Sequence, residues 1–170
     1  MPATDQPVAA ITFEMTRSFD APLASVWQAW SDAALLQRWW GPKGCTLEVA
    51  RLEFRPGGFF HYAMQFPGTP KMWGRFSYRE IAEGSRIVWL NSFANENCGI
   101  ARAPFDDACP LEIENTVVFT EAAGKTTVAL RAVPFGATAP EVKCFNDLKS
   151  SMQEGYGGTL DQLGDLLKKG

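Results

Sequence analysis

The chain has few of the residues on which most catalytic and metal sites depend. It contains one histidine, His61, among 170 residues. This excludes a zinc site with two or three histidine ligands and an iron site with two. A Ser-His-Asp or Cys-His catalytic device would have to use His61. We therefore expect neither a bound metal nor a cofactor.

Basic charge, long apolar runs and paired cysteines are missing as well. The net charge is −3, which argues against nucleic acid as the main partner. No apolar run approaches the ~18 residues that span a membrane. No C-x-x-C pair and no secretory signal is present, so we expect a cytoplasmic protein with reduced cysteines packed as small core residues. A Cys98–Cys109 disulfide is the alternative.

Aromatic residues are abundant, with 12 Phe, 6 Trp and 3 Tyr. Such side chains bury large areas and leave irregular spaces when they pack. Hydrophobic residues make up 46% of the chain and charged residues 21%, a globular composition. We predict a short tail over residues 1–10 and a single domain over residues 11–170.

The hydrophobic periodicity predicts an α+β fold. A strand is expected over 11–20, followed by two short helices over 23–30 and 33–40 and a long amphipathic helix over 140–169. Six further strands are predicted, at 45–55, 59–66, 72–82, 86–93, 111–120 and 126–133. A curved antiparallel sheet of seven strands around one long helix would leave an interior space.

Three glycines interrupt the helical pattern of the C-terminal segment. Gly155, Gly157 and Gly158 each cost a helix about 1 kcal/mol relative to alanine. We expect either a kink there or a close approach of another group to the helix backbone.

Several strings match those of a known family in their order along the chain. They are FDAP at 19–22, WWGP at 39–42, RPGG at 55–58 and SMQEGYGGT at 151–159. The chain resembles the helix-grip proteins of the START-like (SRPBCC) superfamily. Within it, the chain is similar to the homologues of the activator of the 90-kDa heat-shock protein ATPase. The resemblance implies a helix-grip fold but leaves the activity open, because this superfamily includes carriers, cyclases and co-chaperone domains.

Alternation along the strand that starts at Phe59 separates two faces. Phe60, Tyr62 and Met64 share an apolar face that should meet the helix, and all three are candidate ligand-binding residues. His61 then points outward, where we expect a surface residue. If the phase were reversed, His61 would be a candidate general base.

Two asparagines fall among hydrophobic residues on the presumed inner face of the sheet. Asn91 shares its face with Trp89 in one strand, and Asn115 lies in another; all three are candidate ligand-binding residues. Buried amides need hydrogen-bond partners. The two side chains could orient a ligand or, alternatively, satisfy loop backbone.

Five further side chains are candidates for the cavity wall: Trp39, Trp40, Trp73, Met152 and Tyr156. Trp39 and Trp40 are adjacent on a predicted helix, so we expect one in the core and the other at the cavity mouth or in solvent. Methionine fills irregular space and accommodates varied ligands.

These features predict a module that binds a small hydrophobic or aromatic molecule, lipid-like or polyketide-like, between the sheet and the C-terminal helix. The first alternative, implied by the resemblance, is a co-chaperone domain that stimulates a chaperone ATPase. The second is a cyclase- or hydrolase-type enzyme that uses the same cavity. A further alternative is a homodimer, formed through an edge strand or through the predicted loop over 94–110.

Overall fold

The computed structural model describes residues 12–103 and 108–169, and the predicted tail at 1–10 lies outside them. The strands are β1 (Phe13–Phe19), β2 (Thr46–Leu52), β3 (Phe59–Gln65), β4 (Met72–Ala82), β5 (Arg86–Ala94), β6 (Ile100–Ala101), β7 (Glu112–Ala122) and β8 (Lys125–Phe135). The helices are α1 (Leu23–Ser31), α2 (Ala33–Trp39), α3 (Ala139–Asp147) and α4 (Lys149–Lys169). The predicted elements occur in the predicted order, but the structure adds the short β6 and has two C-terminal helices in place of one. The fold is α+β, as predicted.

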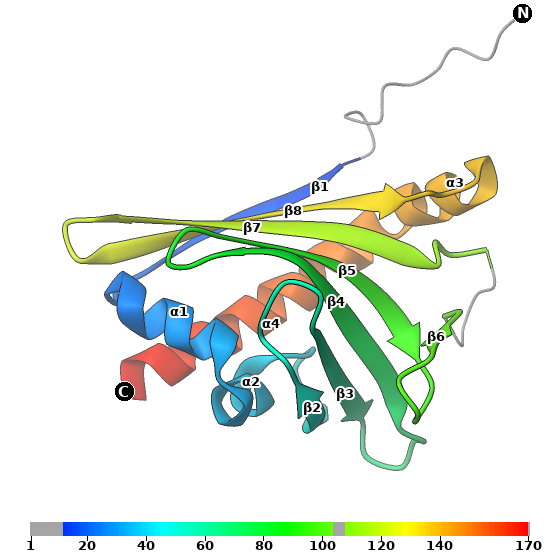
Figure 1. Cartoon of the computed structure of the whole chain (residues 1–170), viewed down its shortest axis with the longest axis horizontal. Coiled ribbons are helices and arrows are strands. Elements are labelled where there is room, and N and C mark those ends of the chain that lie inside the picture. The colour runs from blue at the N-terminus through cyan, green and yellow to red at the C-terminus, as the bar shows by residue number, and fades with distance from the viewer. Residues whose placement is uncertain (1–11, 104–107, 170) are drawn as a thin grey trace, which may run out of the picture.

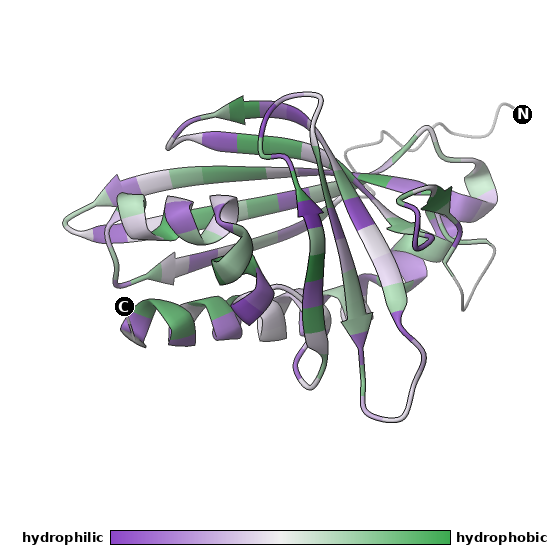
Figure 2. Ribbon diagram, turned by 60° about the horizontal axis from the view of Figure 1, so that its bottom comes forward, coloured by the Kyte–Doolittle hydropathy of each residue, from purple (hydrophilic) through white to green (hydrophobic). Residues whose placement is uncertain are grey.

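The sheet is antiparallel, with the strand order β1-β8-β7-β5-β4-β3-β2. It holds the seven predicted strands, and α4 runs along one of its faces (Figure 1). The short β6, inside the predicted loop over 94–110, pairs with the end of β5, beyond the residues that pair with β7. Hydrophobic and hydrophilic bands alternate along the strands, as expected for a sheet with one covered face (Figure 2).

Local signals in the sequence account for the helix boundaries. The side chain of Asp32 accepts a hydrogen bond from Leu35 N at 3.0 Å, which caps α2. Thr138 and Glu141 form a capping box at the start of α3. The single helix predicted over 140–169 is divided in two at Leu148, next to the weak helix formers Asn146 and Asp147.

The helix α4 runs without interruption from Lys149 to Lys169, across all three glycines. A Cβ atom built on Gly155 or Gly157 would meet no atom within 4 Å, so close approach does not explain either residue. At Gly158 the same Cβ would lie 3.2 Å from the Lys43 side chain. Only this third glycine therefore has a close neighbour.

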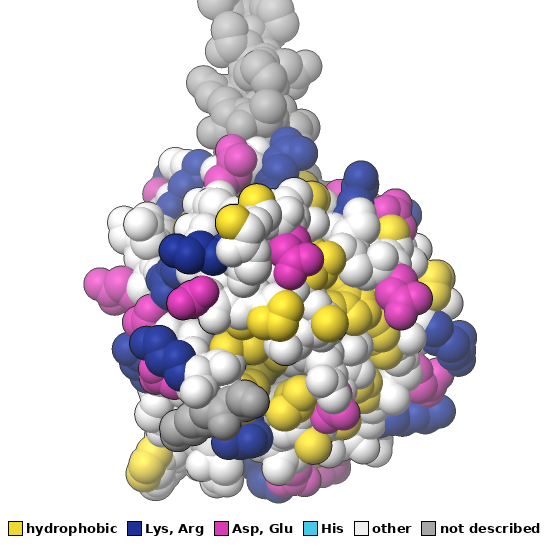
Figure 3. Space-filling model, turned by 90° about the vertical axis from the view of Figure 1, so that its left-hand side faces the viewer, with side chains coloured by type: hydrophobic (Ala, Val, Ile, Leu, Met, Phe, Trp, Pro, Cys, Tyr) yellow, Lys and Arg dark blue, Asp and Glu magenta, His cyan; other side chains and the backbone are white. Residues whose placement is uncertain are grey.

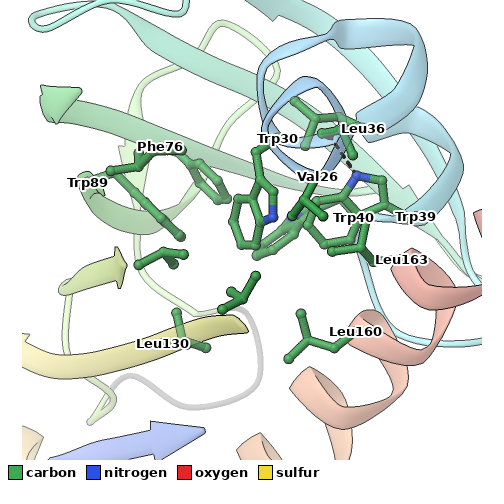
Figure 4. Close-up of a cluster of buried hydrophobic side chains, with 14 of the residues drawn as sticks. Val26, Trp30, Leu36, Trp39, Trp40, Phe76, Trp89, Leu130, Leu160 and Leu163 are labelled. Atoms are coloured by element: carbon green, nitrogen blue, oxygen red, sulfur yellow. Dashed lines mark hydrogen bonds between the residues drawn. The ribbon is translucent and has the colours of Figure 1, made fainter. Parts of the chain in front are cut away.

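Tryptophan and phenylalanine side chains form the centre of the core, where α1 and α2 meet the sheet (Figure 4). Trp30 packs edge-on against Trp39 with ring centroids 4.8 Å apart, and Phe76 stacks on Trp89 at 4.6 Å. Such pairs contribute about 0.5–1.5 kcal/mol beyond their area burial. The aromatic residues thus fill one end of the space between sheet and helix.

Replacement of Trp39 by phenylalanine tests this packing. Trp39 is fully buried, and its indole N–H donates to Ala29 O at 2.8 Å. We expect Trp39→Phe to lower the free energy of unfolding by about 1–3 kcal/mol, because the change removes a buried hydrogen bond. Denaturant unfolding measures the loss.

Trp27→Phe is the control. Trp27 is half-buried, and within the described residues its ring contacts are with Phe54 and Phe119. This variant should lose less stability than Trp39→Phe. Equal losses would contradict the importance of the buried hydrogen bond.

Candidate functional site

An apolar pocket of about 210 Å³ lies between the sheet and the two C-terminal helices. Its walls come from β3, β4, β5, β7, α3 and α4 and from the connection before β7. The lining residues are Tyr62, Met64, Gly74, Asn91, Ser92, Phe93, Ala103, Cys109, Pro110, Leu111, Ile113, Phe145, Leu148, Met152 and Tyr156. This pocket is the interior space that the sequence predicts.

A second space of about 180 Å³ adjoins the first, next to the end of α2. Trp40, Gly155 and Thr159 contribute to its walls. The residues that line both spaces are Tyr62, Met64, Asn91, Met152 and Tyr156. We call the two spaces together the central pocket.

Strand register gives Tyr62 its position in the pocket. Tyr62 of β3 lies opposite Gly74 of β4 in the antiparallel pair. A Cβ atom on Gly74 would lie 2.6 Å from the tyrosine ring, closer than any side chain could tolerate. The glycine therefore makes room for the ring across the strand pair.

Tyrosine hydroxyls and asparagine amides provide polar groups at the pocket. Tyr62 Oη donates to Asn91 Oδ1 at 3.4 Å, and Tyr156 Oη donates to Asn115 Oδ1 at 3.2 Å. Asn115 Nδ2 donates to Ile113 O at 3.2 Å. The Asn115 amide therefore hydrogen-bonds a backbone carbonyl on one side and positions Tyr156 on the other. The Asn91 amide nitrogen makes no hydrogen bond to the described residues, which leaves this donor available to a ligand.

The pocket is electrically neutral. Within the described residues its lining includes no aspartate, glutamate, lysine, arginine or histidine. Burial raises the pKa of Tyr62 above its usual range and raises the pKa of Tyr156 to about 12. Both phenols are therefore protonated at neutral pH, and the pocket suits an uncharged molecule.

Six of the predicted ligand-binding residues line the central pocket: Trp40, Tyr62, Met64, Asn91, Met152 and Tyr156. Phe60, Trp89 and Trp39 belong instead to the packed core, where each is at most 1% exposed. Asn115, fully buried, contacts Tyr156.

Trp39 and Trp40 are both buried in the same core, which corrects the expectation that only one could be. Trp39 is the last residue of α2, whereas Trp40 has an extended backbone with φ −71° and ψ 140°. Since the chain leaves the helix between them, the two rings can meet edge-on at 5.5 Å. Trp40 is the one that lines the pocket.

Trp73 and His61 lie together on the other face of the sheet, so the placement of Trp73 in the cavity wall is wrong. Their rings stack with centroids 4.8 Å apart. His61 points outward as predicted but is buried at 5% exposure, because Trp73 and the turn after β5 cover it. Its Nε2 lies 3.1 Å from Asn95 O. The sheet therefore separates His61 from the central pocket.

Several residues that line the pocket were not predicted as site residues from the sequence. In the alternating pattern, Phe93 shares a face with Asn91 and Ile113 shares one with Asn115. Phe145 and Leu148 belong to the amphipathic pattern of the C-terminal segment. These four could have been found. Cys109 lies in a connection without periodicity, where no signal indicated a pocket wall.

A further hollow of about 850 Å³ lies beside α1. Its lining includes Trp27, Phe54 and Ile81 together with Glu83 and Glu121. The corresponding end of the molecule shows hydrophobic side chains among acidic ones (Figure 3). This hollow is more open than the main space of the central pocket, and it carries carboxylates. The central pocket is therefore the better candidate for binding a small apolar molecule.

Glu141 holds the start of α3 beside the pocket. Its carboxylate accepts a hydrogen bond from Thr138 N at 2.9 Å and a second from Arg102 Nη1. These interactions, the backbone bond first, lower the pKa of Glu141 to about 2. A depressed pKa in the folded state stabilises the fold above the pKa of the unfolded chain, and this contribution is lost as the pH falls.

Glu141→Gln should therefore destabilise the protein at neutral pH. The difference from wild type should shrink as the pH falls from about 4.5, near the ordinary glutamate pKa, to about 2. Denaturant unfolding over a pH series measures it. Glu154→Gln, at an exposed position of α4, is the control. A difference that stays constant with pH would contradict this role of Glu141.

Two features are absent from the part of the chain that the structure describes. No three His, Cys, Asp or Glu side chains are grouped so that they could hold a metal ion. Among the same residues, no helix is long and apolar enough to cross a membrane.

Comparisons with known proteins agree with the fold. The Mycobacterium smegmatis protein Ms6760 has 27% identity, with 98% of this chain and 97% of that chain covered and a TM-score of 0.77. A protein from Arthrobacter aurescens has 25% identity, covers 99% of this chain and 92% of its own, and has a TM-score of 0.79. No curated protein matches the sequence.

The Silicibacter pomeroyi AHSA1 protein has the same fold at 18% identity, with 92% of this chain and 97% of that chain covered and a TM-score of 0.67. Residues 20–168 match the family described as Activator of Hsp90 ATPase homolog 1-like protein. Since this match spans nearly all of the sequence, the chain belongs to that family.

Proposed function

We propose that the protein binds a compact, uncharged, largely apolar molecule, hydrophobic or aromatic, in the central pocket. The observation that carries this proposal is the lining: apolar side chains surround a few polar groups, without a charged side chain among the described residues. Pockets for small molecules typically combine these two features.

The volume limits the size of the ligand. An apolar cavity of about 150 Å³ is large enough to hold benzene. The main space here measures about 210 Å³ and continues into the adjoining one. A molecule of one or two rings, or a short acyl chain, fits these dimensions better than a lipid with two long chains.

The polar groups favour a ligand with a hydrogen-bond acceptor. The Asn91 amide nitrogen can donate to a carbonyl or hydroxyl oxygen, while Tyr62 holds the amide oxygen. A charged ligand would lose its hydration without meeting an opposite charge, which costs free energy. We therefore expect a ketone, ester or alcohol in preference to a carboxylate.

The two alternatives have less support. The enzyme alternative lacks a general base at the pocket, because His61, its candidate for that role, lies across the sheet. Stimulation of a chaperone ATPase rests on the family description. An ATPase assay of the chaperone with and without this protein tests it.

A series of naphthalene derivatives tests the proposal by isothermal titration calorimetry. We expect 2-acetonaphthone to bind more tightly than naphthalene, because its carbonyl oxygen can accept from Asn91. Both should bind at least about tenfold more tightly than 2-naphthoate, a difference of about 1.4 kcal/mol. Equal or tighter binding of the carboxylate, or no binding of any of the three, would refute a neutral pocket.

A pair of leucine substitutions in α4 locates the binding site. Gly155 lines the pocket with open space at its Cβ position, so Gly155→Leu should fill it and weaken 2-acetonaphthone binding about tenfold or more. Gly157→Leu adds the same side chain to the same helix at a position that also has open space but lies outside the pocket lining.

Both leucine variants should fold, because leucine is a better helix former than glycine by roughly 1 kcal/mol. The Gly157→Leu protein should bind as the wild type does. Similar affinities for the two variants would place the binding site elsewhere on the molecule. Thermal unfolding without ligand confirms that each variant is folded.

A further inference from the structure

Two cysteines from distant parts of the sequence meet at the wall of the central pocket. Cys109 lies in the connection before β7, and Cys144 lies in α3. Their sulfur atoms are 2.6 Å apart, and both residues are buried, with exposures of 5% and 9%. Cys109 therefore lies against Cys144, whereas the disulfide considered from the sequence joined Cys109 to Cys98.

Other contacts hold the two segments together independently of the sulfur atoms. Arg102 Nη1 donates both to Cys109 O, at 3.2 Å, and to the Glu141 carboxylate in the first turn of α3. Ala103 joins the two cysteines in a small buried cluster, against which Phe93 and Leu148 pack. These contacts do not depend on the oxidation state of sulfur, so the two cysteines stay adjacent when reduced.

A small oxidant can reach this pair through the pocket. Cys109 belongs to the lining, as does Phe145, the residue after Cys144. The lining is apolar and neutral, so an uncharged oxidant of a few atoms enters more readily than a charged or bulky one.

We propose that Cys109 and Cys144 are a redox-active pair that forms an intramolecular disulfide on reaction with a small hydroperoxide. With hydrogen peroxide, the sulfur of Cys109 attacks one peroxide oxygen and the O–O bond breaks. The departing hydroxide takes up the proton that the thiol gives up, so a sulfenic acid and one water form. The thiol of Cys144 then attacks this sulfur, the S–S bond forms, and the S–O bond breaks with release of a second water. With hydrogen peroxide, two thiols lose two electrons and the peroxide is reduced to two waters.

The crosslink ties the connection before β7 to α3 and closes a chain segment that includes the β7–β8 hairpin. Restricting the unfolded chain in this way stabilises the folded state. It also fixes one wall of the central pocket, and any effect on ligand binding rests on the proposed function. The disulfide itself can be tested without a ligand, so the two proposals can fail separately.

Peptide mapping of the full chain tests the pairing. The reduced protein is treated with hydrogen peroxide at a one-to-one ratio, alkylated under denaturing conditions and digested with trypsin. We expect a linked species of residues 103–125 and 144–149, two hydrogen atoms lighter than the separate peptides, with Cys45 and Cys98 alkylated. Full alkylation of Cys109 and Cys144 after peroxide treatment, or a link between Cys98 and Cys109, would overturn the proposal.

Thermal unfolding gives a second readout. The oxidised protein should melt about 5–10 °C above the reduced one. Cys98→Ser, which leaves the pair intact, should keep this difference, and Cys144→Ser should lose it. The peptide map of the wild-type chain decides the matter even if Cys144→Ser does not fold, because it needs no variant.

Discussion

The structure depends on how one helix covers one face of a strongly twisted seven-stranded sheet. The helix α4 alone cannot fill the space against all strands, so other groups must fill the remainder (Figure 1). At one end α1 and α2 do so with the cluster of Trp30, Trp39 and Trp40 against the sheet. At the other end α3 and the connection before β7 close the space only in part, and the central pocket remains.

The chemistry of the pocket follows from this position. Inner-face side chains of the strands are apolar because they form the core, and the pocket continues that core. The polar groups are limited to neutral ones whose hydrogen bonds can be satisfied there, such as the Tyr156 hydroxyl on Asn115. The same burial keeps the tyrosines protonated, with the pKa of Tyr156 at about 12. A site of this kind selects for shape and neutrality.

Sequence periodicity predicts most of the fold because each inner strand has one covered face. Alternation places Tyr62, Met64 and Asn91 correctly, and all three line the pocket. It cannot predict that a turn would cover the outer face, so the burial of His61 and its stacking on Trp73 were missed. It also missed that the helix ends at Trp39. The extended backbone of Trp40 turns that side chain toward the core, and the sequence pattern does not show this change.

The sequence by itself determined the family, the order of the elements and the neutral, aromatic character of the interior, because these depend on local patterns and composition. Only the tertiary structure decided which inner residues pack tightly and which face open space. It also brought Cys109 against Cys144 and placed His61 across the sheet from the pocket. Such contacts join residues far apart in the chain, and their distances depend on how the sheet twists and how α3 and α4 lie against it.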